Sequence, residues 1–284
     1  MPRLTAILIS HNEEKNLPRA LASLEGIADE IVVVDSGSTD RSVEIATKHG
    51  ARLFTNAFVD FAEQKNYAAA QAASAWVLSL DCDEALSPEL RESLLEWKQG
   101  EPEHVGYEVT RITQFLGGWI WHSGWYPDRL VRLYLRDRGQ FSGKVHENVR
   151  LDGPPGRLAG HLYHFTASSI PEQAAKIDTY TSIAAQELFH GGHKSWRAQM
   201  LLLPPWNLFQ SLVVRLGFLD GYRGLIIARL AARSVFLKYR KLGALQSGGS
   251  HGEGHGAAAS SGSGHPLRVS REGTSERPQH PSDQ

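Results

Sequence analysis

The chain has 284 residues, of which 41% are hydrophobic, and its formal net charge is −1. It is long enough for one large domain or one domain with an appendage, and the balanced charge gives no sign of a nucleic-acid partner. The single cysteine, Cys82, excludes an intrachain disulfide. We see no signal-peptide pattern and no run of about 18 apolar residues, so we expect a cytoplasmic protein without a transmembrane helix.

Strand and helix signals alternate along the first hundred residues. Apolar or β-branched runs predict strands at 4–9, 30–34, 51–54 and 76–80. Helical spacing and helix-start residues predict helices at 13–24, 41–49, 62–73 and 88–97. Such alternation indicates an α/β fold in which helices cover both faces of a parallel sheet.

The later part of the chain changes character three times. Residues 106–165 are rich in strand formers, and 129–135 with 144–151 predict a hairpin around Arg138 and Gly139. After a helix predicted at 171–190, residues 196–242 combine large apolar side chains with eight basic residues and one acid, Asp220. This mixture is typical of interfacial helices on anionic lipid, although packing on the protein itself or on a partner subunit is the alternative.

These patterns predict three parts of the chain. A first domain covers 1–170, and helices that contact the membrane surface cover 171–245. Residues 246–284 are rich in Gly, Ser, His and Pro and have few large apolar side chains. A segment of this composition cannot bury enough surface to fold, so we expect a disordered tail.

The strongest chemical signal is the acidic sequence Asp-Cys-Asp-Glu at 81–84, directly after a predicted strand. In a parallel α/β sheet, ligands bind beyond the carboxyl ends of the strands. Carboxylates there can bind Mg²⁺ or Mn²⁺, which takes its other ligands from water and substrate phosphates. The alternative is that residues 81–84 form a solvated acidic turn. The place of this acidic sequence in an ordered α/β pattern favours a metal site.

Two further polar clusters also follow strands. In residues 35–40, Gly37 permits a tight turn, and the Asp35 carboxylate can hold a ribose hydroxyl or a base N–H. Ser38 or Asp40 can instead cap the next helix. The cluster at 10–14 suits nucleoside contacts, and Lys65 can reach a phosphate unless it is solvated surface.

Residues 7–14, 33–40 and 81–84, in this order and spacing, resemble the family 2 inverting glycosyltransferases of GT-A fold. The similarity covers residues 3–165. Residues 125–133, 144–147 and 217–221 are similar to a subgroup that includes bacterial lipopolysaccharide core glucosyltransferases. The resemblance implies a Rossmann-like mixed sheet flanked by helices, with a helical appendage at the carboxyl end.

The resemblance also implies a site. Asp83 would bind the metal with Asp81 nearby, and His146 would complete the metal shell or contact the diphosphate. The donor-binding residues are then expected to be Ser10, Asn12, Glu13, Asp35, Ser36, Gly37, Lys65 and Asp81.

Inversion at the sugar carbon requires a general base for the acceptor hydroxyl. Many family members carry a Glu-Asp pair before a helix, and no such pair stands in the expected setting here. Asp128 and Glu147 are the candidates; the alternative is that Asp128 pairs with Arg129 or Arg132, and Glu147 with Lys144. Trp119, Trp121 or Trp125 offers a stacking face for the sugar unless these residues belong to the core.

We therefore expect an enzyme that transfers a sugar from a UDP-sugar, with UDP-glucose as the donor. The expected acceptor is a lipopolysaccharide core or other cell-envelope glycan, as a glycolipid or lipid-linked saccharide, and the enzyme would lie on the inner face of the cytoplasmic membrane. One alternative is a polyprenyl-phosphate glycosyltransferase. The other is a non-catalytic nucleotide-sugar sensor or scaffold. Nothing in the sequence indicates the oligomeric state.

Overall fold

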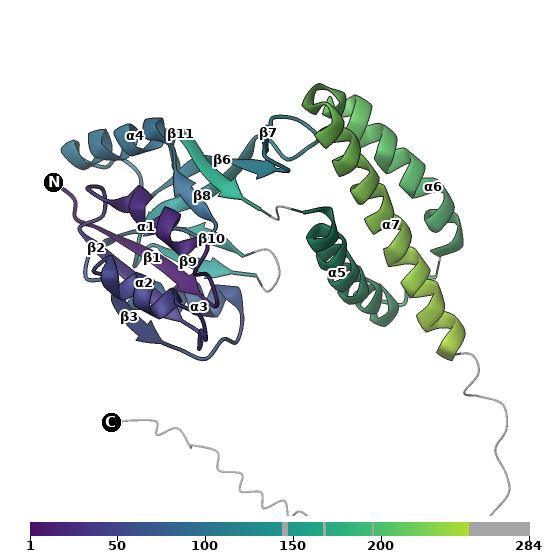
Figure 1. Cartoon of the computed structure of the whole chain (residues 1–284), viewed down its shortest axis with the longest axis horizontal. Coiled ribbons are helices and arrows are strands. Elements are labelled where there is room, and N and C mark those ends of the chain that lie inside the picture. The colour runs from purple at the N-terminus through teal and green to yellow at the C-terminus, as the bar shows by residue number, and fades with distance from the viewer. Residues whose placement is uncertain (144–146, 167–168, 195, 250–284) are drawn as a thin grey trace, which may run out of the picture.

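The structure is a computed structural model that describes residues 1–143, 147–166, 169–194 and 196–249. Over these residues, a nine-stranded sheet is followed by a group of helices (Figure 1). The strand order is β3-β2-β1-β4-β8-β6-β11-β5, and β7 pairs with β6. The strands of this sheet are β1 (Leu4–Ser10), β2 (Glu30–Asp35), β3 (Arg52–Thr55), β4 (Trp76–Ser79), β5 (Glu84–Leu86), β6 (Gly106–Phe115), β7 (Gly118–Ile120), β8 (Asp128–Leu135) and β11 (Gly156–Phe165).

The sheet is mixed. Strands β3, β2, β1 and β4 run parallel to one another, whereas β8 is antiparallel to both β4 and β6. Strand β11 is parallel to β6 and antiparallel to β5. This arrangement confirms the predicted α/β class and its mixed sheet, and it brings the carboxyl ends of β1, β2 and β4 to one edge.

Helices cover both faces of the sheet, as predicted. Helices α1 (Leu17–Leu24) and α4 (Pro88–Gln99) pack in one hydrophobic cluster with Leu8 of β1 and Leu78 of β4. Helix α3 (Phe61–Ala70) packs on the opposite face against Ile7 and Val77. Helix α2 (Ser42–Lys48) follows β2. Side-chain caps at Asp60 and Ser87 begin α3 and α4, because each accepts a hydrogen bond from a backbone N–H of the first turn.

The predicted hairpin between 129–135 and 144–151 is wrong. Strand β8 lies inside the main sheet, and the hairpin is instead formed by β9 (Gly139–Ser142) and β10 (Asn148–Leu151). Leu133 and Tyr134, neighbours in β8, are both fully buried, which is the pattern of a central strand covered on both faces. Phe141 of β9 and Val149 of β10 pack with the α3 side of the core.

The helices at the carboxyl end form their own small core. They are α5 (Ile170–His190), α6 (Trp196–Phe209), the short helices η1 (Gln210–Val214) and η2 (Gly217–Asp220), and α7 (Tyr222–Gly249). Ala185 of α5 packs with Tyr239 and Leu242 of α7. Ile227 of α7 joins Phe115 and Ile120 of the sheet, so the helices are anchored to it. In the part of the chain that the structure describes, no helix is long and apolar enough to cross a membrane.

Candidate functional site

A cleft of about 1000 Å³ opens at the carboxyl edge of the parallel strands. Glu13 follows β1, Asp81 and Asp83 follow β4, and Asp128 begins β8. Helix α5, on the side of α7 that faces the sheet in Figure 1, borders the cleft with Tyr180 and Ile183. The structure thus brings together side chains that the sequence placed after separate strands.

Asp81 lies between two buried cations. Its Oδ1 is 2.8 Å from Lys65 Nζ, and its Oδ2 accepts a 2.9 Å hydrogen bond from Arg132 Nη2. Burial alone would raise the pKa of Asp81, but Arg132 and Lys65 together hold it well below its usual range. Asp81 is therefore ionised, and its charge is already neutralised by the protein.

The ion pairs continue through a fully buried carboxylate, Glu84. Its Oε1 accepts hydrogen bonds from Arg132 Nη2 at 2.6 Å and from Arg111 Nη1 at 3.2 Å. Burial raises the pKa of Glu84 despite these two arginines. Arg111 in turn donates from Nε and Nη2 to Asp128 Oδ2, at 2.9 and 2.7 Å. Asp128 therefore pairs with Arg111, and the expected alternative of Arg129 or Arg132 is wrong.

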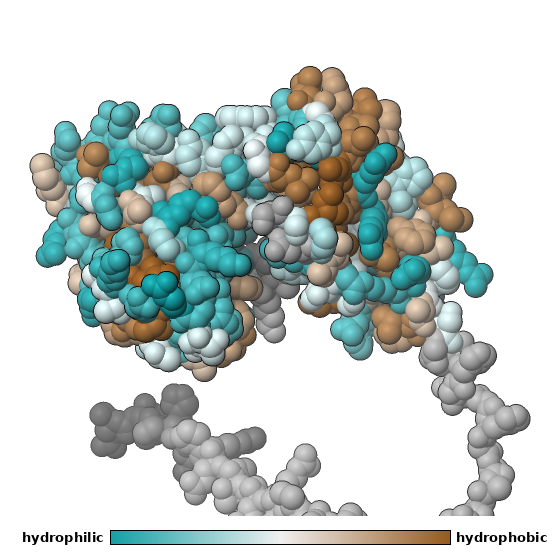
Figure 2. Space-filling model, in the orientation of Figure 1, coloured by the Kyte–Doolittle hydropathy of each residue, from teal (hydrophilic) through white to brown (hydrophobic). Residues whose placement is uncertain are grey.

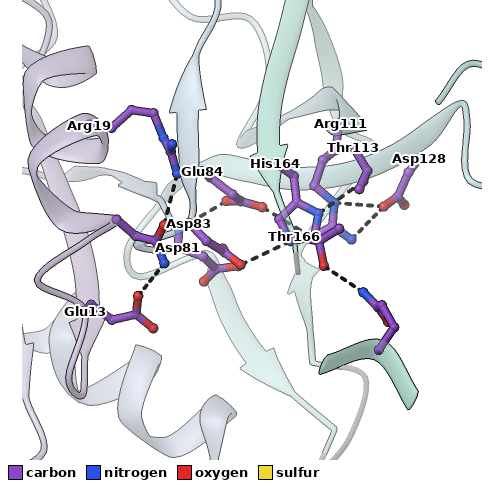
Figure 3. A network of polar contacts seen from close by, with 12 residues as sticks. Glu13, Arg19, Asp81, Asp83, Glu84, Arg111, Thr113, Asp128, His164 and Thr166 are labelled. Carbon is purple, nitrogen blue, oxygen red and sulfur yellow. Dashed lines mark hydrogen bonds and ion pairs between the residues drawn. The ribbon is translucent and has the colours of Figure 1, made fainter. Parts of the chain in front are cut away.

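Asp83 has a different environment. Figure 3 shows it pointing toward His164, the penultimate residue of β11, with Asp83 Oδ2 3.3 Å from His164 Nε2. The other ring nitrogen of His164 lies 3.1 Å from Thr113 Oγ1 on β6, which fixes the orientation of the imidazole. Across the cleft, burial raises the pKa of Glu13, whose Oε2 accepts a hydrogen bond from Asn16.

The chemistry of this pair fits a divalent cation. Carboxylate oxygen suits Mg²⁺ and Mn²⁺, and an imidazole nitrogen oriented by a second hydrogen bond is a common metal ligand. Within the described ranges, no group of three or more metal-ligating side chains is found. A two-ligand site is compatible with a metal that takes its remaining ligands from water and diphosphate. His146 lies outside the described residues.

The predicted donor-binding loop is held by its own polar groups. Asp35 Oδ2 accepts hydrogen bonds from the backbone N–H groups of Gly37 and Ser38, and Oδ1 accepts from Ser38 Oγ. Gly37 has a φ of +85°, a conformation that other residues rarely adopt. Asn12 Oδ1 accepts from Thr39 N, which ties this loop to the one after β1.

Neighbouring side chains extend this arrangement. Ser10 is buried at the end of β1, and Ser36 Oγ accepts a hydrogen bond from Gln64 of α3. Asp40 Oδ1 accepts from the backbone N–H of Ser42 at the start of α2. The N-cap residue of α2 is Arg41, which makes no side-chain capping hydrogen bond, so the predicted cap at Asp40 is wrong.

Lys65 is buried, which contradicts the alternative of solvated surface. Besides Asp81, it donates to Glu147 Oε1 at 2.9 Å. The next residue, Asn66, exchanges two hydrogen bonds with the backbone of Phe141, which fixes α3 against β9. Lys65 thus connects the metal motif to the second candidate base.

The three tryptophans belong to aromatic clusters. Trp119 stacks on Tyr163 with ring centroids 4.7 Å apart, and Trp125 packs on Phe115. Trp121 contacts the rings of Tyr126 and His161 but stays exposed. Of the three, Trp121 presents a ring to solvent.

Sequence reasoning missed Arg111, Arg132 and His164 as site residues. Each lies within a strand and belongs to none of the motifs that follow strands. The charged positions of Arg111 and Arg132 in otherwise strand-like, buried segments were the available signal, because a buried charge requires a partner.

Comparisons with known proteins identify the family of the chain. The family model described as "Glycosyl transferase family 2" matches residues 5–150. The lipopolysaccharide core biosynthesis glycosyltransferase LpsC of Rhizobium meliloti is 30% identical, with 83% of this chain and 93% of that protein covered. An uncharacterized glycosyltransferase of Rickettsia typhi is 26% identical, with 85% and 87% covered.

Solved structures give more distant matches. S. aureus TarS 1-349 matches with a TM-score of 0.38 and 16% identity, covering 87% of this chain and 92% of that one. Glucosyl-3-phosphoglycerate synthase from Mycobacterium tuberculosis matches with a TM-score of 0.33 and 20% identity, covering 40% and 44%.

The family match, together with the mixed sheet and the acidic cleft, defines a nucleotide-sugar transferase of GT-A fold. The chain belongs to glycosyl transferase family 2, and it is a glycosyltransferase.

Proposed function

We propose that this enzyme transfers glucose from UDP-glucose, with inversion, to a lipopolysaccharide core or other cell-envelope glycan. The observation that carries the proposal is the carboxylate of Asp83, which faces the cleft beside His164. The acceptor class is supported by the relative LpsC, whose name includes lipopolysaccharide core biosynthesis and which is matched over 93% of its length.

In this proposal Asp83 and His164 bind Mg²⁺ or Mn²⁺, and Asp81 lies next to these two ligands. When bound, the ion would neutralise charge on the leaving diphosphate. Asp81 fits a supporting position better than direct ligation, because Lys65 and Arg132 already occupy its two oxygens. Because Lys65 and Arg132 already compensate the negative charge of Asp81, Asp83 is the residue of this motif whose carboxylate can bind a cation.

The nucleoside is proposed to lie against the loops after β1 and β2. Glu13 lines the cleft itself. Asp35, Ser36 and Gly37 form the rigid turn described above, and this turn would present backbone and side-chain groups to the base and ribose. Ser10 and Asn12 position the facing loop.

Asp128 is the preferred general base, and Glu147 is the second candidate. Both line the cleft. The Asp128 side chain is 36% exposed and the Glu147 side chain 19%, so Asp128 is more accessible to an acceptor hydroxyl. Arg111 binds Oδ2 of Asp128, which orients Oδ1 for proton abstraction.

The test is calorimetric binding of UDP with and without Mn²⁺. Wild type is expected to bind UDP more tightly with Mn²⁺, and Asp83→Ala should weaken this metal-dependent binding by about tenfold or more. Asp152→Ala, at a carboxylate that is 71% exposed outside the cleft, is the matched control and should bind as wild type does. If folded wild type binds no UDP, the uridine assignment fails.

The two alternatives make different predictions in a second assay. A scaffold that binds the donor without catalysis would release no UDP when an acceptor is added. A polyprenyl-phosphate transferase would release UDP with polyprenyl phosphate and not with a glycan acceptor. We favour the glycan acceptor because of the long match to LpsC.

We also propose peripheral contact with the inner face of the cytoplasmic membrane, supported by the basic and apolar composition of residues 196–242.

A further inference from the structure

The side of α6 that faces solvent is apolar. From α6 to the first residue of α7, the exposed large side chains are Leu201, Leu202, Trp206, Phe209, Val213, Val214, Leu216, Phe218, Leu219 and Tyr222. We call this set the α6 face. Leu202, with 69% of its surface accessible, is the most exposed of them.

Such a surface is unusual for a helix at the edge of a folded protein. The exposed side of an amphipathic helix is normally polar, and a helix that is apolar all round is normally covered. The opposite side of α6 is already used, because Met200 and Leu203 pack against the cluster of Ala185, Tyr239 and Leu242. Figure 2 shows hydrophobic surface gathered on the helical part where α6 and α7 meet. The α6 face therefore requires an occupant.

The charge of residues 196–242 indicates what kind of partner the α6 face binds. Residues 196–242 contain eight basic side chains and one acid, Asp220. The Asp220 side chain is only 2% exposed. Arg215 lies exposed within the α6 face, and Arg197 is exposed on α6 itself. An apolar surface with exposed cations and no accessible carboxylate among its residues is complementary to a negatively charged lipid surface.

We propose that the α6 face docks on the surface of an anionic lipid bilayer. This inference rests on the peripheral membrane contact proposed above and names the surface that makes it. Leu201, Leu202 and Phe218 would enter the apolar boundary of the lipid. Trp206 and Tyr222 are residue types that favour the water–lipid interface. Arg215 would face lipid phosphate.

The position of Asp220 connects this surface to the cleft. Its carboxylate accepts hydrogen bonds from Trp121 N at 3.0 Å, His122 N at 3.1 Å and Ser123 Oγ at 2.8 Å. Residues 121–123 belong to the loop that leads into β8, where Asp128 is the first residue. Docking through the α6 face would therefore bring the loop before the candidate base close to the bilayer, where a lipid-linked acceptor is held.

The experiment is flotation of the full-length protein with two kinds of vesicle. One kind is phosphatidylcholine alone, and the other also contains phosphatidylglycerol. Wild type is expected to float with the anionic vesicles and to be released by high salt. Leu202→Glu and Leu219→Glu should each weaken this binding by about tenfold or more, because each places a charge in the apolar contact.

Val59→Glu is the matched control. Val59 is 69% exposed, as Leu202 is, but it lies in the loop before α3. This variant should float as wild type does. UDP binding in the presence of Mn²⁺ is measured on every variant, so that a folding defect or a failed donor site is separated from a failed docking surface.

Three outcomes would overturn the proposal. The first is wild type that does not float with anionic vesicles, and the second is full flotation of both glutamate variants. The third is a wild-type dimer in sedimentation experiments that Leu202→Glu dissociates, without any difference in vesicle binding. That result would assign the α6 face to a second copy of the chain.

Discussion

The carboxylates of the cleft differ in how far the protein neutralises them. Asp81 is matched by Lys65 and Arg132, whereas Asp83 has a histidine beside it. From the sequence, Asp83 was expected to bind the metal, with Asp81 nearby. Both residues lie in the connection between β4 and β5, and their carboxylates meet different partners: Asp81 contacts Lys65 and Arg132, and Asp83 contacts His164. Their proposed roles differ for this reason.

Asp128→Asn should separate the two candidate bases. If Asp128 removes the acceptor proton, kcat falls by about 10²–10⁴ while UDP affinity stays within about twofold of wild type. Glu147→Gln should lower kcat much less, since Glu147 is bound to Lys65 and is less exposed. The measurement is UDP release with acceptor, alongside calorimetric UDP binding. A larger loss in Glu147→Gln than in Asp128→Asn would reverse the assignment.

At the scale of elements, the local order of strands and helices was predictable and the pairing of distant strands was not. The first four strands and four helices have clear periodicity and short connections, and each was expected within a few residues of its observed position. Strand β8 was expected to pair locally, but its partners are β4 and β6. Periodicity shows that a strand is buried without showing which strand lies beside it.

At the site, too, the sequence predicted local motifs but not the contacts between distant residues. Its motif residues were predictable because polar residues after parallel strands share one edge of the sheet. The contact of Lys65 with Glu147 spans 82 residues of chain, and the pair of Asp83 and His164 joins β4 to the end of β11. These contacts arise from strand order, which no local pattern specifies. His164 was missed for this reason.

A carboxylate that joins several elements should make stability depend on pH. Glu30 at the start of β2 accepts hydrogen bonds from Thr5 Oγ1 of β1 at 2.6 Å and from Ala73 N at 2.8 Å, and it pairs with Arg52 of β3. Burial tends to raise its pKa, but these donors outweigh burial and lower it from the ordinary value of 4.5. A lowered pKa in the folded state contributes stability above pH 4.5, and this contribution is lost as pH falls through the folded-state pKa.

Glu30→Gln is therefore expected to lower the free energy of unfolding by about 1–2 kcal/mol near neutral pH. The difference from wild type should shrink as the pH falls below 4.5. Urea unfolding across this range measures it. Glu44→Gln is the control, because Glu44 is an exposed carboxylate that pairs within one turn of chain. A difference that stays constant with pH would mean that the charge of Glu30 does not contribute.

At the scale of the whole molecule, the sheet and the carboxyl-terminal helices are joined by a small set of contacts. Phe115 and Ile120 of the sheet enclose Ile227 of α7, and Asp220 holds the loop at 121–123. The sequence predicted a division of the chain between residues 170 and 171, and this division stays a prediction. These contacts predict that the two parts nevertheless unfold together, because separating them would expose the Phe115 cluster and leave Asp220 without its donors.

Ile227→Ala tests this cooperativity. Ile227 is 2% exposed, so its truncation should cost about 3 kcal/mol and lower the unfolding midpoint by roughly 6–12 °C in one transition. Val214→Ala, at a position that is 59% exposed, should leave the midpoint nearly unchanged. Calorimetry and tryptophan fluorescence should report the same midpoint, because both parts contain tryptophan. The contrary result is two separate transitions, of which the mutation shifts only the lower one. The helices would then unfold independently of the sheet. In that case the fold would not fix the orientation of the α6 face relative to the cleft.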